Sequence, residues 1–181
     1  ELADMDGDGY LDVLLGAHEY EQSIDFTGIV WNDGRGNFNK HNNTRLPQHK
    51  QKWGTVPEVS AADLDNDGDL DIVYSRAGVL YVGTAIQIIE NLGNKNFKDH
   101  GIFPLLEAPD DYVPVHEGNE WNDCIEDIRF RDLDNDGDID LYLSSGSLKT
   151  NGIILLNQGD FAFEFEAKTI AKFTAQELMD E

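Results

Sequence analysis

An aspartate motif with fixed spacing occurs three times in this chain. The copies begin at Asp4, Asp63 and Asp132, and each reads Asp-x-Asp-x-Asp-Gly-x-x-Asp. Carboxylates at alternate positions repel one another unless a hard cation lies between them, and calcium takes about six to eight oxygen ligands from loops of this kind. An all-oxygen donor set favours calcium over zinc or copper. The motif therefore predicts three loops that each hold one calcium ion.

The ligand positions follow from the spacing within each loop. We expect the first, third, fifth and ninth residues to supply side-chain oxygens and the seventh to supply its backbone carbonyl. The predicted side-chain ligands are Asp4, Asp6, Asp8, Asp12, Asp63, Asp65, Asp67, Asp71, Asp132, Asp134, Asp136 and Asp140, and the predicted carbonyl ligands are those of Tyr10, Asp69 and Asp138. The sixth residue is glycine in every copy, which suits a sharp turn. Magnesium fits this loop less well, because it prefers near-octahedral sites and retains its waters.

The motif has two other interpretations. An EF-hand has a bidentate glutamate at the twelfth position and a helix on each side, whereas the twelfth residues here are Leu15, Tyr74 and Leu143. The residues after each loop are apolar and β-prone, which indicates strands. The second alternative is an acidic turn that is solvated and holds no metal, and three identical spacings argue against it.

The motif belongs to a longer internal repeat. The first aspartate recurs after 59 residues, at Asp63, and then after 69, at Asp132. An asparagine that opens an Asn-x-Gly turn follows each loop, and a phenylalanine comes six residues later. These residues are Asn32, Asn91 and Asn157, with Phe38, Phe97 and Phe163. Asn-x-Gly between apolar runs is a hairpin signal.

This repeat predicts an all-β fold made of β-propeller blades, each with four antiparallel strands. We expect the metal loop between the first two strands, and the Asn-x-Gly turn between the last two. The predicted units are residues 1–56 (without their first strand), 57–121 (with an inserted loop at about 99–124) and 122–181 (with a C-terminal extension). Only Thr174–Met179 has the pattern of a short helix. Three blades do not close a ring of about four to eight, so we expect a partial propeller that the same longer chain or an oligomer completes.

With motif and period together, the chain resembles the FG-GAP/VCBS repeat family. This family includes bacterial surface and secreted propellers and the head of the integrin α-subunit. The resemblance is carried by the three aspartate loops and by the turns Asn32–Phe38 and Asn91–Phe97, while the turn after Asn157 lacks the second glycine. It implies that each loop is the calcium-binding hairpin of a blade, in a protein that is secreted or displayed on a cell surface.

Charge and cysteine content exclude several other classes. The net charge of −23 argues against nucleic-acid binding and against anionic membranes, both of which require basic patches. No apolar run reaches the ~18 residues of a membrane span, so we expect no insertion by this segment. The single cysteine, Cys124, forms no intrachain disulfide and is expected to be a buried thiol.

The sequence contains none of the common catalytic motifs. We therefore expect a non-catalytic scaffold for adhesion, assembly or ligand binding. The alternative is the propeller part of a secreted enzyme, such as a polysaccharide lyase or phospholipase, with its catalytic residues elsewhere. A protein or carbohydrate ligand is expected to bind through loops such as the insertion before Trp121, although an ordinary variable loop is the simpler interpretation. Trp53 and Trp121 occupy equivalent repeat positions, and we expect them to pack between blades.

Overall fold

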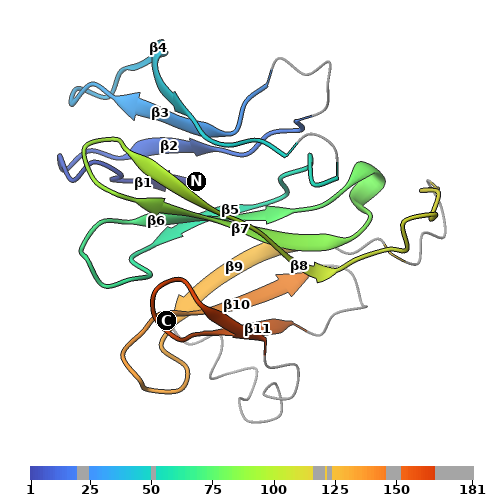
Figure 1. Ribbon diagram of the computed structural model, residues 1–181. Coiled ribbons are helices and arrows are strands. Elements are labelled where there is room, and N and C mark those ends of the chain that lie inside the picture. The colour runs from blue at the N-terminus through green and yellow to red at the C-terminus, as the bar shows by residue number, and fades with distance from the viewer. Residues whose placement is uncertain (20–24, 50–51, 116–120, 122–123, 146–151, 166–181) are drawn as a thin grey trace.

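Three antiparallel sheets of four strands follow one another along the chain and lie side by side (Figure 1). The computed structural model describes residues 1–19, 25–49, 52–115, 121, 124–145 and 152–165. The first sheet comprises β1 (Leu2–Ala3), β2 (Asp12–Leu15), β3 (Gly28–Asn32) and β4 (Phe38–Arg45). The second comprises β5 (Val59–Ala62), β6 (Asp71–Arg76), β7 (Thr84–Asn91) and β8 (Phe97–Leu106). The third comprises β9 (Ile125–Arg131), β10 (Asp140–Ser145), β11 (Ile153–Asn157) and β12 (Phe163–Phe165).

Each sheet is a meander in which every strand pairs with the next one along the chain. None of the three sheets closes on itself or on another, so the molecule is a partial propeller, and we call the sheets blades 1, 2 and 3. This confirms the predicted fold class. The aspartate loops join the first two strands of each blade and lie together on one side of the stack, at the left in Figure 1.

Blade 2 is covered on both faces, and its sequence reflects this. Strand β6 is buried at every position, because successive side chains point to opposite faces and each face meets a neighbouring blade. Ile72 and Tyr74 pack against blade 1, whereas Val73 packs against blade 3. The centre of β6, Ile72–Tyr74, is accordingly a run of consecutive apolar residues, while Asp71, Ser75 and Arg76 at its ends are buried polar or charged residues.

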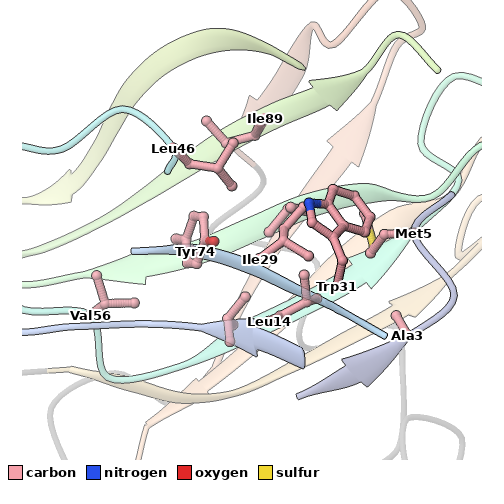
Figure 2. Packing of buried hydrophobic residues seen from close by; sticks show 11 residues of the cluster. Ala3, Met5, Leu14, Ile29, Trp31, Leu46, Val56, Tyr74 and Ile89 are labelled. Carbon is pink, nitrogen blue, oxygen red and sulfur yellow. The ribbon is translucent and has the colours of Figure 1, made fainter. Parts of the chain in front are cut away.

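The hydrophobic core consists of two layers, one at each junction between blades. The first layer joins Met5, Leu14, Ile29 and Trp31 of blade 1 to the side chains of blade 2 that include Tyr74 (Figure 2). The second joins Leu64, Val73, Ile86 and Ile88 of blade 2 to residues of blade 3 that include Leu141 and Leu143. Burial of apolar surface therefore holds neighbouring blades together.

Two details of the predicted blades need correction. The first strand of blade 1 was expected to be missing, but Leu2 and Ala3 form it and pair with Val13 and Asp12. The insertion of blade 2 was expected from about residue 99, whereas β8 continues as a strand to Leu106 and only then leaves the sheet. The predicted short helix at Thr174–Met179 lies outside the residues that the structure describes.

Within the described parts of the chain, no helix is long and apolar enough to cross a membrane.

Candidate metal sites

The aspartates of each loop converge on one point. One carboxylate oxygen from each of three residues lies within 4.8 Å of the other two, in all three loops. The convergent groups are Asp4, Asp6 and Asp8; Asp63, Asp65 and Asp71; and Asp132, Asp134 and Asp136. These residues were all predicted as ligands from the sequence, and they could hold a metal ion.

The first aspartate of each loop organises the turn. In loop 1, Asp4 accepts hydrogen bonds from the backbone N–H groups of Asp8 at 3.1 Å and Gly9 at 2.9 Å. Asp63 and Asp132 bind their own loops in the same way, through Gly68 and Gly137, each at 3.1 Å. The loop backbone thus wraps around the carboxylate of its first residue.

Two positions of each loop adopt a left-handed backbone. The sixth position was expected from its glycine, and Gly68 has φ 97°. The fourth position was not, and there Gly7, Asn66 and Asn135 have φ 69°, 62° and 64°. Glycine and asparagine enter this region with little steric cost. The signal was present in the sequence, because the fourth residue of each loop is one of these two types.

The ninth aspartate of each loop is buried and bridges two backbone segments. Asp71 accepts one hydrogen bond from the N–H of Leu64 at 2.9 Å and another from the N–H of Asn91 at 2.8 Å. Asp12 binds Met5 and Asn32 in the same manner, at 3.1 and 2.8 Å. Asp140 likewise accepts from the N–H groups of the residues equivalent to Leu64 and Asn91, at 2.6 and 2.8 Å. The bridge connects the aspartate loop to the Asn-x-Gly turn of the same blade.

This bridging role was not foreseen from the sequence, which assigned the ninth residue only as a ligand. Among the convergent groups, only that of loop 2 contains its ninth residue, Asp71. Burial raises the pKa of Asp71 to about 7, and the neighbouring carboxylates of Asp65 and Asp67 contribute to the rise. Burial also raises the pKa of Asp12 and of Asp140. A nearby cation would favour the ionised form of each carboxylate.

The surroundings of one carboxylate oxygen in loop 1 indicate whether the loop is suited to a cation. Oδ1 of Asp6 is buried and has no hydrogen-bond partner, while Oδ2 of the same group lies 2.9 Å from Nζ of Lys95. A buried polar atom without a partner costs free energy, and a cation among Asp4, Asp6 and Asp8 would satisfy it. The donor set is oxygen throughout, as hard cations require. The residues of this loop fit a bound metal ion.

The seventh residues lie beside the Asn-x-Gly turns. The ring of Tyr10 lies against Gly34, and the carboxylate of Asp69 lies against Gly93. Asp138 reaches the neighbouring blade, where its Oδ1 accepts a hydrogen bond from Nδ2 of Asn66 at 3.0 Å. The predicted role of their backbone carbonyls as ligands stays a prediction.

The turn asparagines also join neighbouring blades. Nδ2 of Asn91 donates to the carbonyl of Leu70 in its own blade at 3.2 Å and to that of Met5 in blade 1 at 3.0 Å. Nδ2 of Asn157 donates within its own blade at 3.2 Å and to the carbonyl of Leu64 in blade 2 at 2.7 Å. Met5 and Leu64 are both the second residue of an aspartate loop. Each turn of blades 2 and 3 is therefore hydrogen-bonded to the aspartate loop of the preceding blade.

Residues 3–74 match the family model described as FG-GAP-like repeat. The chain carries an FG-GAP-like repeat. The matched residues run from β1 through the first loop and most of β6, so they contain the loops of blades 1 and 2. The loop of blade 3 lies beyond the FG-GAP-like match and repeats the hydrogen bonds of the first two. No curated protein and no solved structure matches the chain.

The segment after β8 lies on the side of the blades opposite the aspartate loops (Figure 1). A pocket of about 320 Å³ there is lined by residues that include Lys52, Trp53, Asp110 and Tyr112. Trp53 is 7% exposed and lies against Gly83 of blade 2, and its predicted packing between two blades stays a prediction. Trp121 is half-buried beside Tyr112. Cys124 was expected to be buried and is instead half-buried.

Proposed function

We propose that this chain is a calcium-binding segment of an extracellular β-propeller, which acts as a non-catalytic scaffold for adhesion, assembly or ligand binding. The observation that carries the proposal is the convergence of three aspartates in each of three equivalent loops. The partnerless Oδ1 of Asp6 adds to it, because this buried oxygen lacks the ligand that a cation would provide.

Each ion would act on folding, not on catalysis. The first, third and fifth aspartates would hold it in blades 1 and 3, and Asp63, Asp65 and Asp71 would hold it in blade 2. A bound calcium ion neutralises charge that would otherwise repel within the loop. Calcium sites of extracellular modules have Kd values on the order of 10⁻⁴–10⁻³ M. A loop of that affinity would fill in calcium-rich fluid outside cells, so the proposed metal and the proposed extracellular placement are consistent with each other.

The partner would bind away from the ions. The pocket beside Trp53 and Tyr112 combines aromatic rings with the charged side chains of Lys52 and Asp110. Pockets that combine apolar surface with a few polar groups are the usual form of a ligand site. We assign the protein or carbohydrate ligand of the scaffold to this side of the molecule.

Calcium titration of the purified chain tests the proposal. We expect calorimetry to detect about three weak sites, and we expect Tm to rise by several degrees in calcium and to fall again with chelator. Magnesium at the same concentration should give a smaller rise.

A pair of matched variants assigns the effect to the loops. Asp65→Asn should remove one site and part of the rise in Tm, whereas Asp111→Asn makes the same change of charge at an exposed residue outside the loops and should remove neither. A Tm that is identical in calcium and in chelator would contradict the proposal.

A further inference from the structure

A lysine of blade 2 contacts the aspartate loop of blade 1. Lys95 belongs to the turn between β7 and β8, and this turn lies beside the loop of blade 1 (Figure 1). Its Nζ is 2.9 Å from Oδ2 of Asp6 and 4.0 Å from the centre of the Trp31 ring. Asn91, which opens the same turn, donates to the carbonyl of Met5 at 3.0 Å. The lysine side chain and the turn that carries it are thus both bound to blade 1.

The turn position of Lys95 has a left-handed backbone in all three blades, but its residue differs. Gly36, Lys95 and Phe161 occupy it, with φ values of 80°, 62° and 59°. Glycine enters this region at the lowest steric cost, whereas larger residues are uncommon there and persist where their surroundings hold them. Phe161 is 6% exposed and belongs to the apolar layer between blades 2 and 3. Lys95 instead brings a positive charge to a carboxylate of the preceding blade.

The charge of Lys95 acts on more than one carboxylate of loop 1. The side chain of Asp6 is 16% exposed, so solvent screens its ion pair with Lys95 only in part. Burial raises the pKa of Asp12, the ninth residue of the loop, and the positive charge of Lys95 opposes that rise. The equivalent of Asp6 in loop 2 is Asp65, whose pKa is raised by burial and by neighbouring carboxylates that include Glu90. The two equivalent aspartates therefore differ in the charge beside them.

We propose that Lys95 is a built-in counter-cation of loop 1, which stabilises this loop in the absence of metal and lowers its affinity for calcium. The part that concerns affinity rests on the proposed function, and the part that concerns the metal-free loop does not. A calcium ion held by Asp4, Asp6 and Asp8 would meet the ammonium group of Lys95 at the carboxylate of Asp6. Because like charges repel at such short range, binding to loop 1 is weakened by a positive charge that is already present.

The loop glycines allow each site to be followed separately. Gly9, Gly68 and Gly137 are the sixth residues of the three loops, and the N–H of each donates to the first aspartate of its own loop. Their amide resonances are recorded by NMR spectroscopy while the whole chain is titrated with calcium. We expect Lys95→Met to move the midpoint at Gly9 to a calcium concentration about tenfold lower. The midpoints at Gly68 and Gly137 should change by less than about twofold.

Two further variants separate the charge of Lys95 from its packing. Lys52 has a similar environment, because its Nζ lies 5.5 Å from the centre of the Trp53 ring and 3.1 Å from Oε1 of Glu107. It lines the pocket on the side opposite the aspartate loops (Figure 1). Lys52→Met therefore removes the same charge and should leave the midpoint at Gly9 unchanged. Lys95→Arg keeps the charge at the loop and should retain the weak affinity of the original chain.

Melting in chelator tests the metal-free role of Lys95. Lys95→Met should lower Tm by about 2 °C more than Lys52→Met, because the partly buried carboxylate of Asp6 loses its counter-charge. In saturating calcium this difference should become smaller, since the ion then neutralises the same carboxylates.

The outcomes distinguish this inference from the proposed function. Calcium-dependent shifts at all three glycines, with the same midpoint at Gly9 in Lys95→Met and in the original chain, would overturn the counter-cation and leave the proposed function intact. A shift at none of the glycines would contradict the proposed function. The Tm values in chelator would then decide about Lys95 alone, and equal values for Lys95→Met and Lys52→Met would overturn its role there as well.

Discussion

At the scale of single residues, aspartates that look identical in the motif have different tasks. Asp67 is exposed, and among the described residues its side chain accepts a hydrogen bond only from the N–H of Asp69 in its own loop, at 2.8 Å. Asp71 is buried and accepts from the backbone of both Leu64 and Asn91. Asp67 thus shapes the loop locally, whereas Asp71 also connects the loop to the rest of the blade.

This difference predicts two distinct effects of alanine. Asp71→Ala leaves two buried N–H groups without an acceptor, at about 1–3 kcal/mol for each group. It should therefore lower the free energy of unfolding in chelator, as measured by urea denaturation. Asp67→Ala removes an exposed carboxylate whose hydrogen bond stays within the loop, so it should change that value little. Equal losses of stability for both variants in chelator would contradict the assignment.

The sequence predicted that carboxylates converge in each loop but not this division of tasks. The carboxylates of one loop are close together in the sequence, so the convergence of Asp4, Asp6 and Asp8 could be predicted from their spacing alone. The burial of Asp71 depends on the turn at Asn91, which lies 20 residues further along and meets the loop only after β6 and β7 have paired. The hydrogen bonds of Asn91 and Asn157 to the preceding blade could not be predicted from the sequence either, because they also join residues that are far apart along the chain.

At the scale of elements, a buried ion pair connects the segment after β2 to the end of β6. Arg76 donates to Glu19 at 2.8 and 3.3 Å, and both side chains are 0% exposed. Arg76 also donates to the carbonyl of Trp53 at 2.9 Å and to Gln87 at 2.8 Å. The guanidinium thereby joins blade 2 to both the loop after β2 and the segment that leads into β5.

Removing one partner of this ion pair should lower the free energy of unfolding strongly. Glu19→Ala leaves the charge of Arg76 buried without its carboxylate, which costs about 3–5 kcal/mol in comparable sites. The matched control is Glu107→Ala, which breaks an ion pair with Lys52 whose side chains are 48% and 52% exposed. A surface pair contributes about 0–1 kcal/mol. Urea denaturation measures the free energy of unfolding of the two variants. Similar losses would show that the ion pair between Glu19 and Arg76 does not stabilise the contact between the segment after β2 and β6.

The elements themselves were largely predictable. Apolar, β-prone runs such as Asp71–Tyr74 and Ile125–Phe130 became β6 and β9, and each final strand begins at the phenylalanine of its repeat. The length of β8 was not predictable, because Phe97–Leu106 contains Gly101 and Pro104, which usually weaken a strand. Pairing with the long, buried β7 overrides this local preference.

At the scale of the whole molecule, excess negative charge makes stability depend on pH. The net charge is −23, and the pKa values of Asp12, Asp71 and Asp140 are raised mainly by burial. In the unfolded chain Asp71 would have a pKa near 3.8, against about 7 in the folded protein. The folded state therefore binds more protons between these values, and its stability falls as the pH rises through about 7.

We accordingly expect the Tm in chelator to fall between pH 5 and pH 8. Calcium should oppose this trend, because an ion binds the ionised carboxylates and its stabilisation grows as protons leave. Scanning calorimetry at several pH values, with calcium and with chelator, measures both trends. A Tm in chelator that rises with pH over this range would count against the raised pKa values.

The hydrogen bonds of the ninth aspartates and those of the turn asparagines form one continuous chain of hydrogen bonds across the three blades. It runs from Asp140 through Asn157 and Leu64 to Asp71, and from there through Asn91 and Met5 to Asp12. Repeats that touch only their neighbours unfold as a one-dimensional array with nearest-neighbour terms. An ion lost from one loop would then loosen the adjoining interface as well as its own blade, so the three sites would be coupled in affinity although no ligand is shared between them.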